Sequence, residues 1–340
     1  MKCNSRTLAL AALLLALPVP VWAHVKWFVD YDVKIAPASL TAIAGSLSFW
    51  ALLVFATLVI FATSLADRRL PSLHEIPRFR PQLQRAHHWV PAIMRVGTGL
   101  FFLILGLFYP QVILTPELIV ANPWLTFIHL AIAITALTRK TSFIAGLLML
   151  FLYSYAVQLY GAFHMLDYLL FVALGIYLIS QTFLAVENDE RVMAFVRLML
   201  CYSFLWGAVE KFMQPNLYFQ LLGAHPWLAM GLDWAFFVRG CGFVELCLIW
   251  HIYSGKLASY ACIVLFALIA VLAFIPFGIT DVVGHFAFIV PLVAILLTPR
   301  ETVLFRSAIA NTAAFLVMLL TLLLFGSLSY SVLQYNTHLH

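Results

Sequence analysis

The stretch LTAIAGSLSFWALLVFATLVIFATSL at residues 40–65 decides the fold class. It contains no charged side chain, and the polar run Asp67, Arg68 and Arg69 follows it. As an α-helix, an apolar run of about 20 residues or more spans the hydrocarbon core of a bilayer. The stretch therefore predicts a transmembrane helix.

Further apolar runs recur along the rest of the chain. With the first, they predict an all-α polytopic membrane protein of about ten transmembrane helices. The other nine are placed at 90–109, 123–137, 141–160, 167–183, 196–211, 234–251, 257–274, 282–297 and 307–328. Between the sixth and seventh, the amphipathic segment 215–230 is expected to lie in the membrane interface.

The composition excludes several other classes of protein. Hydrophobic residues make up 64% of the 340 positions, and charged residues only 10%, against about a quarter in soluble domains. A soluble enzyme, a nucleic-acid-binding module and a disordered protein are therefore excluded. The net charge of +5 comes from basic loops and does not indicate a nucleic-acid partner.

Lysine and arginine collect in alternate loops, which sets the orientation of the chain. By the positive-inside rule these loops are cytoplasmic. The sequence thus predicts a multi-pass protein of the bacterial inner membrane, with the mature N-terminus and the C-terminus in the periplasm. The basic residues on the cytoplasmic side are Arg68, Arg69, Arg78, Arg80, Arg85, Arg139, Lys140, Arg191, Lys256, Arg300 and Arg306.

The first 23 residues have the pattern of a cleaved signal peptide. Lys2 and Arg6 precede a short apolar stretch, and Ala23 stands at the expected cleavage site. Cleavage there makes His24 the first residue of the mature protein. A free amino group and the imidazole Nδ1 of one residue can chelate Cu(II), which favours nitrogen ligands. The alternative is that histidine stands first without any role.

Two stretches of the chain resemble each other, which predicts two parallel four-helix units. Arg95 matches Arg197, Trp124 matches Trp234, and Gly161 matches Gly278. Chance similarity between apolar sequences is the alternative. The predicted organisation is a signal peptide (1–23), a periplasmic N-terminal segment (24–39), a first helix (40–66), a basic cytoplasmic loop (67–89), the first unit (90–185), the second unit (186–298), a last helix (299–329) and a periplasmic tail (330–340).

Four charged residues lie in the outer half of the second unit: Glu210, Lys211, Arg239 and Glu245. Charges inside a bilayer are costly and face the interior of a helix bundle, where they pair. They are the candidate catalytic residues, and they could bind a quinone head group, relay protons or hold an anion. They could equally fix the packing of the sixth and seventh helices.

Asp281 and His285 are four residues apart and share one helix face. A carboxylate beside an imidazole can orient it as a base or a metal ligand, and His164 occupies the matching place in the first unit. His24, His164, Asp281 and His285 are therefore the candidate metal ligands. The alternative for the aspartate is ordinary helix capping.

The second unit, at about 197–298, resembles the DoxX-like membrane family. An arginine opens its first helix (Arg197), a glycine and a lysine close it (Gly207 and Lys211), and GFVE at 242–245 has the form of the family's G-x-x-E motif. The resemblance implies a membrane component of a quinone-linked or thiol- and sulfur-related redox system. It also implies that Arg197 and Glu245 help to bind the cofactor.

Three functions remain in competition. The first is a quinone-linked redox component with a soluble or periplasmic redox partner. The second is a periplasmic-facing copper-binding membrane protein that uses His24. The third is a transporter of a small solute or ion, with the charge cluster as its site. The sequence leaves open whether the protein is an enzyme.

Overall fold

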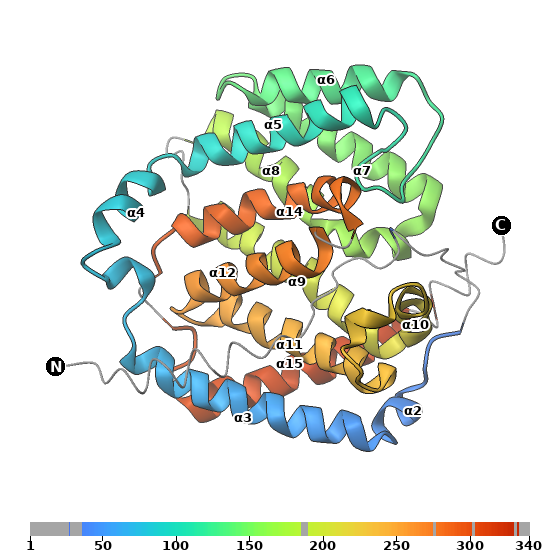
Figure 1. Ribbon diagram of the computed structural model, residues 1–340. Coiled ribbons are helices and arrows are strands. Elements are labelled where there is room, and N and C mark those ends of the chain that lie inside the picture. Colours follow the sequence, from blue (N-terminus) through green and yellow to red (C-terminus); the bar gives the residue numbers. More distant parts are fainter. Residues whose placement is uncertain are drawn as a thin grey trace.

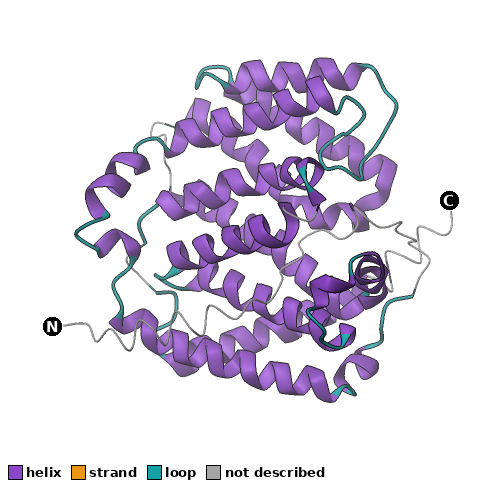
Figure 2. Ribbon diagram, viewed as in Figure 1, coloured by secondary structure: helices purple, strands orange, loops and turns teal. Residues whose placement is uncertain are grey.

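The computed structural model describes Trp27, residues 36–184, 190–274, 277–300 and 303–329, and Val332. This part of the chain is helical (Figure 2), without a strand beyond one antiparallel bridge between Val112 and Ile119. The longer helices are α3 (Leu47–Arg69), α5 (Val90–Phe108), α6 (Trp124–Ala136), α7 (Ser142–Met165), α8 (Leu169–Phe183), α9 (Glu190–Met213), α11 (Trp234–Ser254), α12 (Ala258–Ile269), α14 (Ile279–Leu297) and α15 (Ala308–Ser329). The shorter ones are α2 (Leu40–Ala44), η2 (Leu73–Glu75), α4 (Arg80–His87), η3 (Leu166–Tyr168), α10 (Pro215–Ala224), η4 (Pro226–Ala229) and η5 (Ala270–Phe274).

The fold is that of a multi-pass α-helical membrane protein, as predicted. Within the described residues, seven helical segments are long and apolar enough to cross a membrane. They are Leu47–Glu75, Val90–Phe108, Ser142–Phe183, Glu190–Met213, Trp234–Ser254, Ile279–Leu297 and Ala308–Ser329. Trp124–Ala136 and Ala258–Ile269 are shorter apolar helices. Each of the ten predicted ranges contains a helix, while the count of ten crossings stays a prediction.

Local sequence signals explain where several helices begin and end. At the start of α11, Asp233 Oδ1 accepts a hydrogen bond from the Phe236 backbone N–H at 2.8 Å, which caps the helix. Pro215 opens α10 at a position where the missing N–H costs no hydrogen bond. Arg68 and Arg69 lie in the last turn of α3, where cations are favourable.

The helices form two sets of four that close in the same way (Figure 1). In the first set α5 packs against α6, α6 against α7, and α7 against α8. In the second set α9 packs against α11, α11 against α12, α12 against α14, and α14 against α9. The sets join where α8 contacts α9 and α5 contacts α14, while α3 and α15 pair along the second set. The division of the chain into two repeated units, and their origin by duplication, stay predictions.

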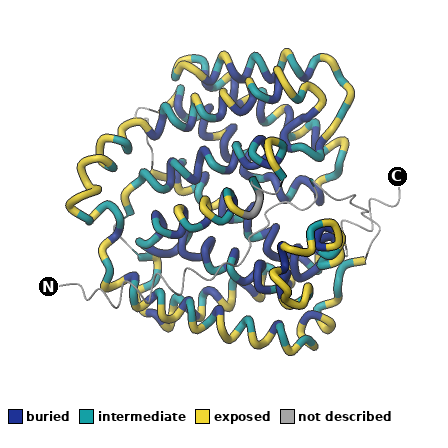
Figure 3. Tube along the Cα trace, in the orientation of Figure 1, coloured by how far each residue is buried: buried dark blue, intermediate teal, exposed yellow. Residues whose placement is uncertain are grey.

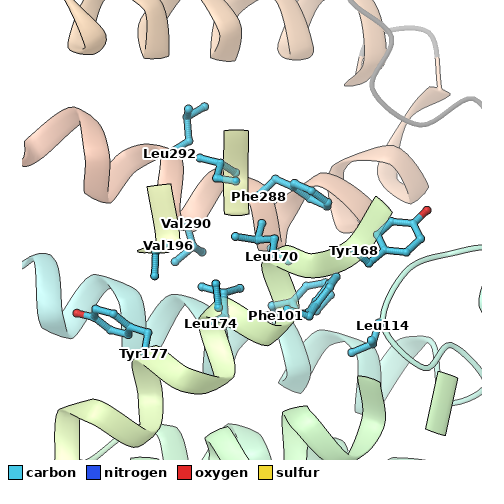
Figure 4. Close-up of a cluster of buried hydrophobic side chains, with 14 of the residues drawn as sticks. Phe101, Leu114, Tyr168, Leu170, Leu174, Tyr177, Val196, Phe288, Val290 and Leu292 are labelled. Carbon is cyan, nitrogen blue, oxygen red and sulfur yellow. The ribbon is translucent and has the colours of Figure 1, made fainter. Parts of the chain in front are cut away.

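Large apolar side chains fill the joint between the two sets (Figure 4). Phe101, Tyr168 and Leu170 from the first set meet Phe288 and Val290 of α14. Many residues on the outside of the bundle are exposed (Figure 3), and large apolar side chains are among them: Leu47 on α3 is 84% exposed and Ile309 on α15 is 73% exposed. Apolar surfaces of this kind suit contact with lipid rather than water.

Two glycines adopt the left-handed backbone at corresponding places in the two sets. Gly161 has φ 83° near the end of α7, and Gly278 has φ 70° immediately before α14. A positive φ favours glycine because it has no Cβ. These are the two glycines that the internal similarity of the sequence pairs with each other. His164 lies three residues after Gly161, and Asp281 lies three residues after Gly278. Both turns therefore place a polar residue at the same end of the bundle.

Candidate functional site

A fully buried ion pair joins α9 to α11. Lys211 Nζ lies 2.6 Å from Glu245 Oε2, and neither side chain is exposed. The ammonium also donates to the Gly207 carbonyl at 3.2 Å and lies 5.2 Å from the centre of the Tyr218 ring. Because an unpaired charge is very costly in this environment, the pair holds the two helices in register.

The second oxygen of the same carboxylate is left without a partner. Glu245 Oε1 is buried and has no hydrogen-bond partner among the described residues. Glu210, also buried, and His285 act electrostatically on this carboxylate. The predicted charge cluster and the predicted histidine–aspartate pair therefore belong to one buried polar region, which we call the α9–α11–α14 cluster (Glu210, Lys211, Glu245, Asp281 and His285).

His285 is oriented by Asp281 within the first turns of α14. Its Nδ1 lies 2.9 Å from Asp281 Oδ2 and 3.0 Å from the Asp281 carbonyl oxygen, and both residues are buried. A proton on Nδ1 donates to the Asp281 carbonyl oxygen and lies beside the Asp281 carboxylate, which leaves Nε2 as the nitrogen that can accept a proton or bind a metal. The spacing of four residues between Asp281 and His285 predicted correctly that the two side chains meet.

Trp27 covers His285 and reaches across to the first set of helices. Its ring meets the His285 ring edge-on, with 4.8 Å between the centroids. Gly284 makes room for the indole, since a Cβ on this glycine would come within 2.2 Å of the Trp27 ring. On the other side the indole Nε1 donates to the Tyr168 hydroxyl at 3.3 Å. Trp27 thus lies between the two helix sets.

A second polar group lies beyond Tyr168. The Tyr168 hydroxyl and Thr115 Oγ1 donate to Glu117 Oε1, the latter at 3.0 Å. His164 Nε2 lies 3.8 Å from the same oxygen. Sequence reasoning found His164 but missed Glu117, an acidic residue in the loop after α5, a position that alone gives no sign of this contact.

Arg239 does not join the Lys211–Glu245 pair. Its Nη1 donates to Ser48 Oγ on α3 at 2.7 Å, and the residue is half-buried. The four charges that the sequence groups together are therefore divided: Glu210, Lys211 and Glu245 gather in one cluster, while Arg239 faces α3.

Arg197 lies at the other end of α9. It is 14 residues from Lys211 along one helix, about 21 Å at 1.5 Å per residue. Its charge acts on Cys201, Cys262 and Arg300 rather than on the Glu245 carboxylate. The structure thus does not bring together the two residues that the resemblance assigns to cofactor binding.

Three of the four candidate metal ligands lie in the part of the chain that the structure describes. His164, Asp281 and His285 are described, and His24 lies outside the described residues. In the described part, histidine, cysteine, aspartate and glutamate form no group of three or more that could hold a metal ion. A metal site therefore needs a ligand from elsewhere, and His24 is the candidate that the sequence offers.

Comparisons with protein-family models, with curated proteins and with solved structures give no match to this chain.

Proposed function

We propose that the protein is the membrane component of a redox system and that its α9–α11–α14 cluster binds the head group of a quinone. The observation that carries this proposal is Glu245 Oε1, a buried carboxylate oxygen without a hydrogen-bond partner among the described residues. Buried acceptors are paired in most structures because leaving one unpaired costs about 1–3 kcal/mol. A hydroxyl of the reduced head group would supply the missing donor.

Four residues of the cluster have a definite part in this proposal. Lys211 fixes one oxygen of Glu245, so the other oxygen has a set direction. Asp281 fixes His285 in the same way through Nδ1. Glu245 and His285 can then each hold one proton, which matches the two protons that a quinone gains or loses with two electrons. The electrons would pass to or from a soluble or periplasmic redox partner.

Two further observations support the proposal. Lys211 and Glu245, which the resemblance to DoxX-like proteins singles out, are the residues that form the buried pair. Basic residues such as Arg69 at the end of α3, Arg85 on α4 and Lys140 between α6 and α7 lie at the opposite end of the bundle. By the positive-inside rule we place the cluster toward the periplasm and the protein in the inner membrane.

The alternative role of the cluster is purely structural, as a device that fixes the register of α9 and α11. The quinone content of purified protein separates the two roles. We expect wild type and Glu75→Gln, a change at the other end of the molecule, to retain about one quinone per chain, and Glu245→Gln to retain much less. Folded wild type that retains no quinone and binds none when it is added would contradict the proposal.

A second candidate function, copper binding toward the periplasm, is favoured by the position of Trp27. This residue contacts His285 and Tyr168, and it lies three residues from His24, the predicted mature N-terminus. Three peptide units span at most about 11 Å. The donors on offer, an amino group and imidazoles, suit Cu(II), and Asp281 holds His285 as carboxylates hold metal-binding histidines.

Metal content by mass spectrometry, with the mature N-terminus determined in the same sample, tests this candidate. Copper near one ion per chain, lost in His24→Ala and His285→Ala but kept in His88→Ala, is the expected result. His88 is exposed at the other end of the molecule and serves as the control. An uncleaved leader, or copper retained by both variants, would contradict the candidate.

A further inference from the structure

An apolar groove runs along the outside of the second helix set, on the side of α11 away from Glu245. It has a volume of about 580 Å³ and lies between α3, α11 and α12. Each of the three helices contributes apolar residues to its lining, for example Phe55 from α3, Phe243 from α11 and Leu268 from α12. The other lining residues are apolar as well. Its volume falls within the range of ligand sites. Phe55 is 47% exposed, so the groove opens on the surface that faces lipid.

Arg239 and Ser48 are polar residues beside the groove, close in sequence to residues that line it. Ser48 lies one helical turn before Leu52, and Arg239 lies three residues after Phe236 and four before Phe243. The three apolar residues line the groove. The hydrogen bond from Arg239 Nη1 to Ser48 Oγ therefore places a guanidinium group beside the apolar lining, about one helical turn before the first lining residues of α3.

Among the residues that the structure describes, none supplies a counter-charge to Arg239. No carboxylate among the described residues lies within salt-bridge distance of its guanidinium, and its hydrogen bond goes to a neutral hydroxyl. Lys211, on the next helix, is paired with Glu245. Since an arginine readily makes two parallel hydrogen bonds to a phosphate, Arg239 is suited to an anion that comes from outside the chain.

The loop before α11, which contains Met230 and Leu232, indicates how deep this part of the groove lies in the membrane. Met230 adopts φ 51° and Gly231 φ 78°, and this left-handed turn brings Met230 and Leu232 to the groove's edge. Trp227, Met230 and Leu232 are 61%, 52% and 45% exposed. Exposed tryptophan and apolar side chains at a helix end are typical of the bilayer interface, where lipid phosphates lie.

We propose that the groove holds one acyl chain of a phospholipid whose phosphate binds Arg239 and Ser48. Charge complementarity selects this occupant, because the groove offers one uncompensated cation at the depth of the phosphates and an apolar channel below it. The proposal does not depend on the redox function, since the groove and the α9–α11–α14 cluster lie on different faces of α11.

Native mass spectrometry of the purified full chain, titrated with a phosphatidylglycerol, tests this site. We expect one tightly held phospholipid per chain. Arg239→Gln should weaken it about tenfold or more, the usual effect of losing a charge-assisted hydrogen bond. Val244→Trp, which fills the groove, should weaken it as well, and Ser48→Ala should do so to a smaller extent. Arg85→Gln, an exposed arginine on α4, is the matched control and should bind as wild type.

Three results would overturn the proposal. The first is unchanged lipid binding in Arg239→Gln and Val244→Trp when both have the wild-type thermal unfolding temperature. The second is inorganic phosphate that displaces the lipid at equal concentration, which would indicate a simple anion site. The third is a dimer that Val244→Trp dissociates, which would mean that a second copy of the chain covers the groove. If Arg239→Gln does not fold, the lipid binding of Ser48→Ala and Val244→Trp tests the proposal.

Discussion

Lys211 and Glu245 form a 2.6 Å ion pair that is completely buried between α9 and α11. The pair neutralises two charges that neither lipid nor the apolar core could accommodate singly. It also leaves one carboxylate oxygen, Glu245 Oε1, without a hydrogen-bond partner in the described part of the chain. One oxygen of the carboxylate is thus held by Lys211, and we propose that the other accepts a hydrogen bond from a ligand.

Lys211→Met should destabilise the protein strongly, because it leaves the Glu245 carboxylate buried and uncompensated. Removing one partner of a buried pair costs about 3–5 kcal/mol. The double variant Lys211→Met/Glu245→Met should recover most of that loss, since two apolar side chains replace the pair. Thermal unfolding in detergent measures both effects. A double variant less stable than Lys211→Met would show that the charges stabilise the fold by something other than their pairing.

At the other end of the molecule, Asp67 should matter much more than Glu75, although both contact Lys256. Asp67 is buried, and its carboxylate accepts from the backbone N–H groups of Lys256 and Leu257 at 3.2 and 2.8 Å. Asp67→Ala leaves both donors unpaired and should cost about 2–4 kcal/mol. Glu75 makes a 3.5 Å ion pair in which its side chain is 43% exposed, so Glu75→Gln should cost no more than about 1 kcal/mol. The unfolding free energy of each variant is measured by chemical denaturation. Equal losses in Asp67→Ala and Glu75→Gln would contradict this prediction.

The close approach of α7 and α8 should tolerate no added methyl group. A Cβ on Gly146 would lie 2.4 Å from the Gly175 carbonyl oxygen, so the two helices would have to move apart. Gly146→Ala should therefore lower the unfolding temperature. Gly223→Ala, on α10, is the matched control: a Cβ there has no atom within 4 Å, and alanine favours helix by about 0.5–1 kcal/mol. An unfolding temperature for Gly146→Ala at or above that of Gly223→Ala would contradict this packing.

His87 should make the fold sensitive to acid. Burial at the end of α4 lowers the pKa of its imidazole below the ordinary 6.5, and repulsion from His74 and His88 lowers it further. Between the two pKa values the unfolded chain binds more protons, so stability is complete above pH 6.5 and falls as the pH drops toward the folded pKa. His87→Gln should show a smaller loss of unfolding temperature between pH 7 and pH 5 than wild type. His88→Gln, which changes an exposed neighbour, is the control. If the unfolding temperature of His87→Gln depends on pH in the same way as that of wild type, His87 does not cause the acid sensitivity.

The sequence predicts the helices well because an apolar run long enough to cross a bilayer has few other stable forms. It also predicts the contact between Asp281 and His285, since residues four apart on one helix always share a face. In both cases the information is local.

Contacts between helices could not be predicted in the same way. Arg239 and Glu245 are six residues apart on α11, and the sequence alone does not show that one faces α3 and the other α9. The hydrogen bond from Arg239 to Ser48 and the contact of Trp27 with His285 join residues about 190 and 260 positions apart. Such pairs depend on how whole helices pack. For the same reason Glu117, in a loop, gave no sign that it would meet His164.

The central claim, that the α9–α11–α14 cluster binds a quinone head group, is tested most directly by calorimetric titration of purified protein with a short-tailed quinol. The double variant Lys211→Met/Glu245→Met is the decisive comparison, because it removes the acceptor without leaving a buried charge. We predict about one site per chain in wild type and in Glu75→Gln, with affinity at least about tenfold weaker in the double variant. Equal affinity in wild type and in a folded double variant would contradict the claim.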